Sequence, residues 1–110
     1  MARQLNRLTD SEIKSAFYET KGDKKLFDGG GLFLHVKESG RYWRLKYHIG
    51  GRERLLAIGV YPEISLKQAR DERDQARQLV RQGIDPVQHR RERQQQLERN
   101  QENSFRALAD

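Results

Sequence analysis

Lysine and arginine recur at alternate positions through the middle of the chain, chiefly between Arg41 and Arg54. In an extended strand, alternate side chains lie on one face about 6–7 Å apart, which is comparable to the phosphate spacing along a nucleic-acid strand. Six basic residues and two glutamates occupy the segment from Leu32 to Ile58, so most of the chain's net charge of +6 lies there. The pattern predicts a nucleic-acid interface. Its candidate contact residues are Lys37, Arg41, Tyr42, Arg44, Lys46, His48, Arg52 and Arg54.

Catalytic and metal chemistry find little support in the sequence. The chain has no cysteine. The candidate nucleophiles fall at expected helix caps, turns or the C-terminal tail, without a histidine and a carboxylate nearby: Ser11, Ser39, Ser65 and Ser104. His35 and His48 share one expected sheet face but would lie about 13 Å apart at ~3.3 Å per residue, too far for one metal ion. The run Gly29–Gly31 lacks the Gly-Lys-Ser/Thr ending of a phosphate loop. We therefore predict no catalytic residues, no cofactor and no metal site.

Four segments have the aromatic and branched composition of β-strands. They are a brief first strand, Leu26–Phe27, and three longer ones, Leu32–Lys37, Arg41–Ile49 and Arg52–Val60. The two connectors between the longer strands, Ser39-Gly40 and Gly50-Gly51, predict two-residue hairpin turns. The sequence thus predicts a three-stranded antiparallel meander with a short strand before it.

The two predicted turns fix which side chains share a face. The first would place Leu34 opposite Leu45, and the second would place Trp43 opposite Ile58, so both turns select the same parity. The shared core face comprises Leu32, Leu34, Val36, Trp43, Leu45, Tyr47, Ile49, Leu56 and Ile58. The outer face comprises Phe33, His35, Lys37, Tyr42, Arg44, Lys46, His48, Glu53, Leu55 and Ala57.

Capping patterns mark two helices around this sheet. Thr9 begins a short N-terminal helix that we expect to end near residues 20–22, and Ser65 begins a longer helix that stops at Gly83. The longer helix carries an apolar stripe that Arg73 interrupts, and this stripe would cover the core face of the sheet. Nearby acids offset the basic residues of this helix, so we expect the basic residues to lie on a solvated face. They are Lys67, Arg70, Arg73, Arg77 and Arg81.

The chain changes character at Asp85-Pro86, which predicts the start of another helix. The residues that follow are almost purely polar, whereas apolar residues return at Phe105. We predict a folded domain over residues 1–85 and a polar linker helix over residues 86–110, the latter ending at the start of a truncated unit. The fold class is α+β. No stretch approaches the ~18 apolar residues of a membrane span, and the N-terminus lacks a signal-peptide pattern.

Several motifs in order resemble the N-terminal domain of tyrosine-recombinase integrases from prophages and genomic islands. The resemblance covers about residues 5–90. Its motifs are Leu8-Thr9-Asp10, Asp28-Gly29-Gly30-Gly31-Leu32, Trp43-Arg44-Leu45-Lys46-Tyr47, Ile58-Gly59-Val60-Tyr61-Pro62, Ser65-Leu66-Lys67-Gln68-Ala69-Arg70 and Gly83-Ile84-Asp85-Pro86.

The resemblance implies sequence-specific binding of double-stranded DNA at arm-type sites, with the outer sheet face in the major groove. It implies a chain that is not itself an enzyme, because the catalytic domain of the recombinase would lie elsewhere. It also implies that residues 104–109 are the start of a truncated core-binding domain. It also implies a bacterial cytoplasmic, nucleoid-associated location, with other integrase protomers and accessory DNA-bending proteins as partners of the full-length protein.

Two other functions remain open from the residues alone. An RNA or single-strand binding module would use Phe33 and Tyr42 as stacking platforms. A protein-interaction module would present the same basic sheet face, or the edge at residues 24–28, to an acidic partner.

Overall fold

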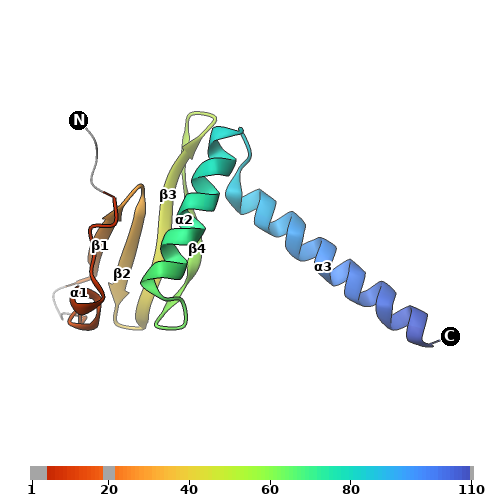
Figure 1. Cartoon of the computed structure of the whole chain (residues 1–110), viewed down its shortest axis with the longest axis horizontal. Coiled ribbons are helices and arrows are strands. Elements are labelled where there is room, and N and C mark those ends of the chain that lie inside the picture. The colour runs from red at the N-terminus through yellow and green to blue at the C-terminus, as the bar shows by residue number, and fades with distance from the viewer. Residues whose placement is uncertain (1–4, 19–21, 110) are drawn as a thin grey trace.

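The chain forms one twisted antiparallel sheet with helices on a single face. The computed structural model describes residues 5–18 and 22–109, with side chains described up to residue 101. The elements are α1 (Asp10–Lys14), β1 (Lys24–Gly29), β2 (Leu32–Lys37), β3 (Gly40–Ile49), β4 (Arg52–Tyr61), α2 (Leu66–Arg81) and α3 (Pro86–Ala109) (Figure 1). The strands lie in the order β1-β2-β3-β4. The predicted α+β fold is therefore confirmed, although β1 is longer than the two residues expected.

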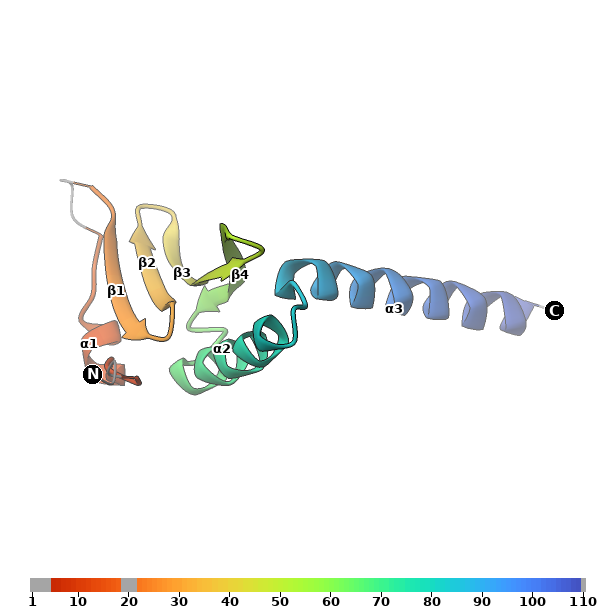
Figure 2. The same ribbon diagram turned by 90° about the horizontal axis from the view of Figure 1, so that it is seen from above.

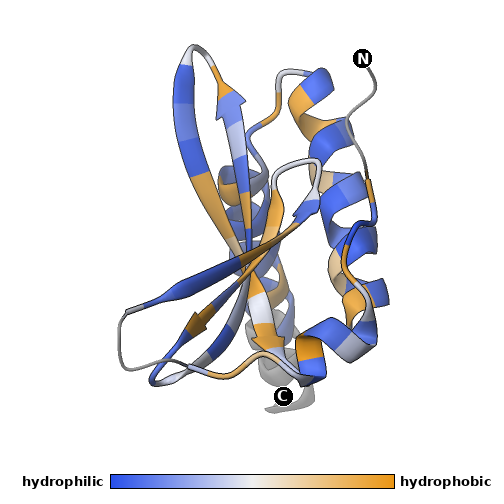
Figure 3. Cartoon of the chain, turned by 90° about the vertical axis from the view of Figure 1, so that its left-hand side faces the viewer, coloured by the Kyte–Doolittle hydropathy of each residue, from blue (hydrophilic) through white to orange (hydrophobic). Residues whose placement is uncertain are grey.

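The hairpin of β3 and β4 turns at Gly50-Gly51, as predicted, and Leu45 pairs with Leu56. The predicted register fails at one point, because a β-bulge between Trp43 and Arg44 places Gly59 opposite Trp43 where Ile58 was expected. A bulge increases the local twist of a strand pair. Figure 3 shows this strongly twisted sheet with helices along one side.

The turn between β2 and β3 lies one residue earlier than predicted. Lys37 pairs with Gly40, so the turn residues are 38 and 39, and Leu34 lies opposite Trp43 where Leu45 was expected. Moving a two-residue turn by one position shifts the register by two, which leaves every side chain on the same face. This parity explains why the predicted core face holds despite the wrong partners.

The core lies between the sheet and its helices. All nine residues predicted for the core face are buried except Ile49, which is partly buried against the same cluster. Leu66, Ala69 and Ala76 of α2 and Ile13 of α1 join the cluster. Figure 2 shows both helices on the same side of the sheet. Within the described ranges, no helix covers the opposite face of the sheet.

The first helix is shorter than predicted. Thr9 caps α1 by accepting a hydrogen bond from the backbone N–H of Glu12, as expected, but the helix ends at Lys14 and not near residues 20–22. Its last turn tightens, because the N–H of Ala16 donates to Ile13 O. Aromatic residues follow at positions 17 and 18, and aromatic residues are weaker helix formers than alanine or leucine.

The second helix has both predicted ends, and the third leaves the body. Ser65 and Gln68 form a complete capping box, and Gly83 follows the C-cap with a φ of +79°. Asp85 then caps α3 by accepting a hydrogen bond from the N–H of Val87. Residues 90–101 of α3 are all exposed, and this helix projects away from the sheet (Figure 1).

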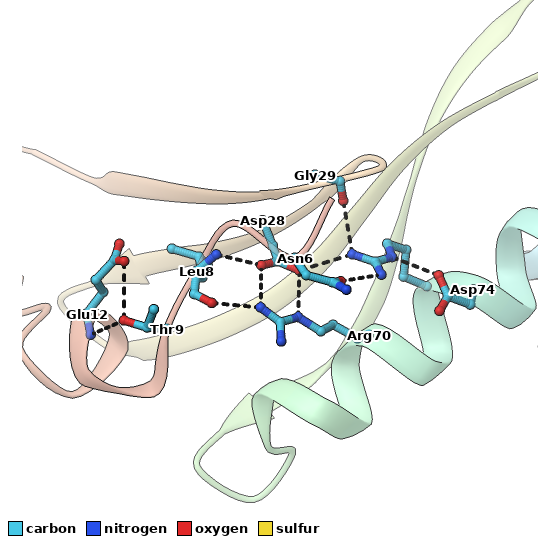
Figure 4. Close-up of polar contacts among 9 residues, drawn as sticks. Asn6, Leu8, Thr9, Glu12, Asp28, Gly29, Arg70 and Asp74 are labelled. Carbon is cyan, nitrogen blue, oxygen red and sulfur yellow. Dashed lines mark hydrogen bonds and ion pairs between the residues drawn. The ribbon is translucent and has the colours of Figure 1, made fainter. Parts of the chain in front are cut away.

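A buried ion cluster ties α2 to the N-terminal segment. Asp28 is fully buried and accepts hydrogen bonds from the N–H of Leu8, from Arg70 and from Arg73 (Figure 4). Arg73 is only 2% exposed, and its guanidinium also donates to Asn6 and to the Asp74 carboxylate. The prediction that Arg70 and Arg73 lie on a solvated helix face is therefore wrong. The buried carboxylate that binds them lies more than 40 residues away in the sequence, beyond the reach of a local charge pattern.

We predict that Asp28→Asn destabilises the fold by about 3–5 kcal/mol, because it leaves the buried Arg73 charge without its buried carboxylate. Burial alone raises the pKa of the Asp28 carboxyl, but hydrogen bonds from Arg70 and Leu8 and the two guanidinium charges together hold this pKa below its ordinary value of 3.8. The carboxylate's stabilisation is thus complete above the unfolded-state pKa and is lost as the pH falls through the folded-state pKa.

Urea unfolding at neutral pH and at decreasing acidic pH measures both effects. Asp74→Asn is the matched control, because that carboxylate binds the same guanidinium but is 58% exposed, and exposed pairs contribute only about 0–1 kcal/mol. Equal unfolding free energies for the two variants would contradict the structural role assigned to Asp28.

Candidate nucleic-acid interface

The uncovered face of the sheet combines basic and apolar side chains. Five of the predicted contact residues alternate along β2 and β3 on this face: Lys37, Tyr42, Arg44, Lys46 and His48. Phe27, Leu55 and Val60 flank them and are 54%, 51% and 39% exposed. This surface is the outer face predicted from the sequence, to which the structure adds Lys25 and Phe27 of β1 and Val60 of β4. It presents cations for phosphates together with apolar groups for base or sugar contacts.

Arg44 is held in place at the centre of the outer face. Its Nη1 donates to His35 Nδ1 at 2.8 Å, and its guanidinium lies 5.7 Å from the centre of the Tyr42 ring. Since Nδ1 of His35 accepts this bond, the ring proton of the neutral imidazole must lie on Nε2, which is 3.0 Å from the Asp23 carboxylate. The hydrogen bonds between Asp23 and His35 and between His35 and Arg44 therefore orient the Arg44 guanidinium in the absence of a ligand.

Near the β3–β4 turn, the basic side chains of the outer face form only weak ion pairs with a neighbouring glutamate. Glu53 lies 3.5 Å from Lys46 Nζ and 3.7 Å from His48 Nε2, and all three side chains are about half exposed or more. Exposed pairs of this kind contribute about 0–1 kcal/mol, so a phosphate can displace the carboxylate at little cost.

The phenylalanine open to solvent on this face is Phe27 and not Phe33. Phe33 is 3% exposed, with its ring 5.5 Å from that of Phe27 and Lys25 Nζ 5.6 Å from its centre. Sequence reasoning placed Phe27 in a two-residue strand and gave it no part in DNA binding, only a place in the edge at residues 24–28 of the protein-interaction alternative. Phe27 pairs with Phe33 of β2. If the sequence analysis had paired β1 with β2, this register would have placed Phe27 on the outer face.

Comparison with known proteins identifies the family. Residues 8–93 match the model of a family described as the arm DNA-binding domain. The chain belongs to the arm DNA-binding domain family. It is 43% identical over 81 residues to prophage integrase IntS of Escherichia coli K12, covering 73% of this chain and 21% of that protein. It is 51% identical over 65 residues to the integrase of Enterobacteria phage P4, covering 56% and 15%.

The matched region is the N-terminal region of these integrases. Across prophage integrase IntA of Escherichia coli K12, the identity is 34% over 113 residues, which is 100% of this chain and 27% of that protein. The chain therefore spans about a quarter or less of the length of the relatives it matches. The resemblance drawn from the sequence motifs is confirmed.

Three of the predicted contact residues lie on the helix side of this arm DNA-binding domain. Arg41 donates to Ile13 O at 3.2 Å and lies 4.9 Å from the centre of the Tyr61 ring, so it packs α1 against the sheet. Arg52 is exposed at the hairpin turn opposite Ile49. Arg54 pairs with Asp85. These arginines do not share the outer face with Arg44.

Asp85 joins the sheet of the domain to α3. It accepts hydrogen bonds from Tyr47 Oη at 2.5 Å and from the N–H of Val87 at 2.9 Å, and its second oxygen lies 2.8 Å from Arg54 Nη1. Arg90, one turn into α3, donates to the carbonyls of Ala57 and Ile58. One carboxylate thus caps α3 and fixes its first turn on β3 and β4.

Within the described part of the domain, no group of three or more His, Cys, Asp or Glu side chains is placed to hold a metal ion. No helix there is both long and apolar enough to cross a membrane.

We predict that the Tyr47 phenol titrates near pH 12. Burial and then the hydrogen bond to Asp85 raise the pKa of Tyr47 from 10.0 to about 12. In the variant Asp85→Asn this pKa should fall part of the way toward 10, because burial remains while the carboxylate charge is gone. Tyrosinate absorbance followed with pH measures the shift, and Tyr47→Phe identifies the group that titrates. An Asp85→Asn curve that superimposes on the wild-type curve would show that the Tyr47–Asp85 bond does not form in solution.

Proposed function

We propose that this domain binds duplex DNA at arm-type sites by laying its outer face in the major groove. The observation that carries the proposal is the arrangement of Arg44, Lys46 and His48 along one uncovered face of β3, opposite the helices. A β-ribbon fits the major groove, which is about 12 Å wide. There, one arginine can donate two hydrogen bonds to a guanine, one to O6 and one to N7.

The local contacts support different roles for the residues of the outer face. Arg44 is oriented by His35, which suits a fixed bidentate contact with a base. Lys46 and His48 are exposed and share only Glu53, which suits contacts with phosphates. Leu55 and Val60 are exposed and apolar, and they can contact thymine methyl groups.

The double variant Arg44→Ala with Lys46→Ala should weaken binding to attachment-site duplex DNA, because it removes two cations from the outer face. The expected loss is about tenfold or more, which corresponds to ~1.4 kcal/mol or more of binding free energy. The slope of log K against log salt should become shallower by about 0.9 for each phosphate that the variant no longer neutralises. Fluorescence anisotropy over a salt series measures both quantities. Footprinting of the wild-type domain on the DNA around its attachment site supplies the duplex.

The matched control removes two positive charges from the helix side of the domain. Lys14 and Lys67 are exposed on α1 and α2, so Lys14→Ala with Lys67→Ala should change affinity and slope little. If both double variants bind alike, with circular dichroism showing an intact fold, the outer face is not the DNA surface.

Arg44→Lys separates base contacts from phosphate contacts. Lysine keeps the charge but has no planar fork, so the preference for the attachment site over random duplex should fall while the salt slope stays near the wild-type value. An unchanged preference would show that Arg44 does not read a base.

Single-strand binding is the weaker alternative, because Phe33, one of its two expected stacking platforms, is buried. Competition between duplex and single-stranded oligonucleotides separates the two functions. An intact domain that shifts no nucleic acid at low salt would favour the protein-interaction alternative.

For the wider protein we propose the organisation expected from the sequence. Residues 1–85 form the DNA-binding body, and residues 86–110 lead as a polar helix toward further domains of a tyrosine recombinase that carry catalysis. The names of the relatives, which are integrases of phages and prophages, support this proposal. Other integrase protomers and DNA-bending proteins are its proposed partners, at the nucleoid in the bacterial cytoplasm.

A further inference from the structure

A basic groove lies where the end of β3 passes the C-terminal half of α2. Its volume is about 600 Å³. Positive charge comes from Lys46, Arg77 and Arg81, with His48 beside them, and apolar walls come from Leu45 and Val80. None of the described residues that line the groove is an aspartate or a glutamate. The groove therefore combines positive charge with apolar walls.

Arg77 is a half-buried cation with no partner in the described part of the chain. It makes no hydrogen bond and no ion pair there, whereas Arg73, one turn earlier on α2, contacts three side chains. A Cβ atom at Gly30 would lie only 3.0 Å from Arg77 Nη1. Because Gly30 has no side chain, the Arg77 guanidinium has room to lie against the β1–β2 turn.

The spacing on α2 brings like charges together. Arg73, Arg77 and Arg81 follow one another at four-residue intervals, and like charges at this spacing repel one another on a helix. Asp28 and Asp74 compensate Arg73. Across residues 5–18 and 22–101, no carboxylate pairs with Arg77 or Arg81.

The groove is continuous with the outer face. β3 runs to Ile49, but its pairing with β2 ends at Leu45, and beyond that point the N–H of Lys46 donates to Gly31 O. The β3–β4 hairpin therefore extends past the end of β2 (Figure 1). Lys46 and His48 belong to the outer face and also line the groove. A basic path thus passes around the free edge of β3 to α2.

We propose that this groove holds a backbone phosphate of the bound duplex, next to the major-groove contact, and that Arg77 and Arg81 clamp it. The proposal rests on the function proposed above and adds α2 to the DNA-binding surface. Guanidinium groups bind phosphates through paired, charge-assisted hydrogen bonds, and the apolar walls suit the adjoining sugars. A duplex lying along β3 would reach these arginines only at its flank.

The test is the double variant Arg77→Gln with Arg81→Gln, measured by anisotropy on attachment-site duplex. The salt slope should become shallower by about 0.9 for each phosphate released from the groove, and affinity should fall equally for specific and random duplexes. The control Lys67→Gln with Arg99→Gln removes the same charge from exposed positions that do not line the groove. The unfolding midpoint should stay the same, which excludes a purely structural role at the end of α2.

Single neutral methylphosphonate linkages locate the phosphate. With the wild-type domain, neutral linkages at one flank should weaken binding, and the Arg77 and Arg81 variant should no longer respond to those linkages. A variant that responds to every linkage as the wild type does overturns the proposal. A second outcome would also overturn it. Inorganic phosphate would bind in the groove, as detected by chemical-shift changes of the Gly30 and Gly31 amides, and yet would not compete with duplex DNA.

The two proposals can fail separately. If Arg44→Ala with Lys46→Ala weakens duplex binding while Arg77→Gln with Arg81→Gln does not, the outer face binds DNA and the groove does not. If neither variant changes binding, both proposals are wrong.

Discussion

The buried carboxylate of Asp28 is the contact on which the arrangement of the domain depends. It lies at the end of β1 and binds the N-terminal segment through Leu8 and the helix α2 through Arg70 and Arg73. Isolated buried charges are strongly unfavourable, so each of these groups needs the others to be in place. The positions of three parts of the chain that are distant in sequence therefore depend on one another.

This constraint determines which face of the sheet remains open. Because Arg70 and Arg73 hold α2 over the core face, the opposite face of β2 and β3 receives no helix from the described part of the chain. The same contacts place the second half of α2 beside the β1–β2 turn, where Gly31 has no room for a side chain, since a Cβ would collide with the carbonyl oxygen of Lys46. The packing of α2 on one face thus leaves the other face uncovered in the described part of the chain.

Sequence reasoning succeeded where local geometry decides the structure. Alternation predicted the faces of β2 and β3 even though the turn was misplaced, and Ser65 marked the start of α2 because a cap acts within one turn. It failed where charged residues pair over long distances. The partners of Arg73, Arg41 and Arg54 were missed, because they are Asp28, Ile13 and Asp85, which lie 45, 28 and 31 residues away in the chain.

We therefore expect the availability of a cation, more than net charge, to determine which residues can form the proposed DNA surface. Arg41, Arg54 and Arg73 are bound to backbone carbonyls or carboxylates that hold the fold together, and a phosphate would have to replace those partners. Arg44 donates to a neutral histidine ring, and Arg77 has no partner among the described residues. A chain of net charge +6 can therefore place only some of its cations on a nucleic acid, because Asp28, Asp85 and backbone carbonyls such as Ile13 O hold several of the described arginines within the fold.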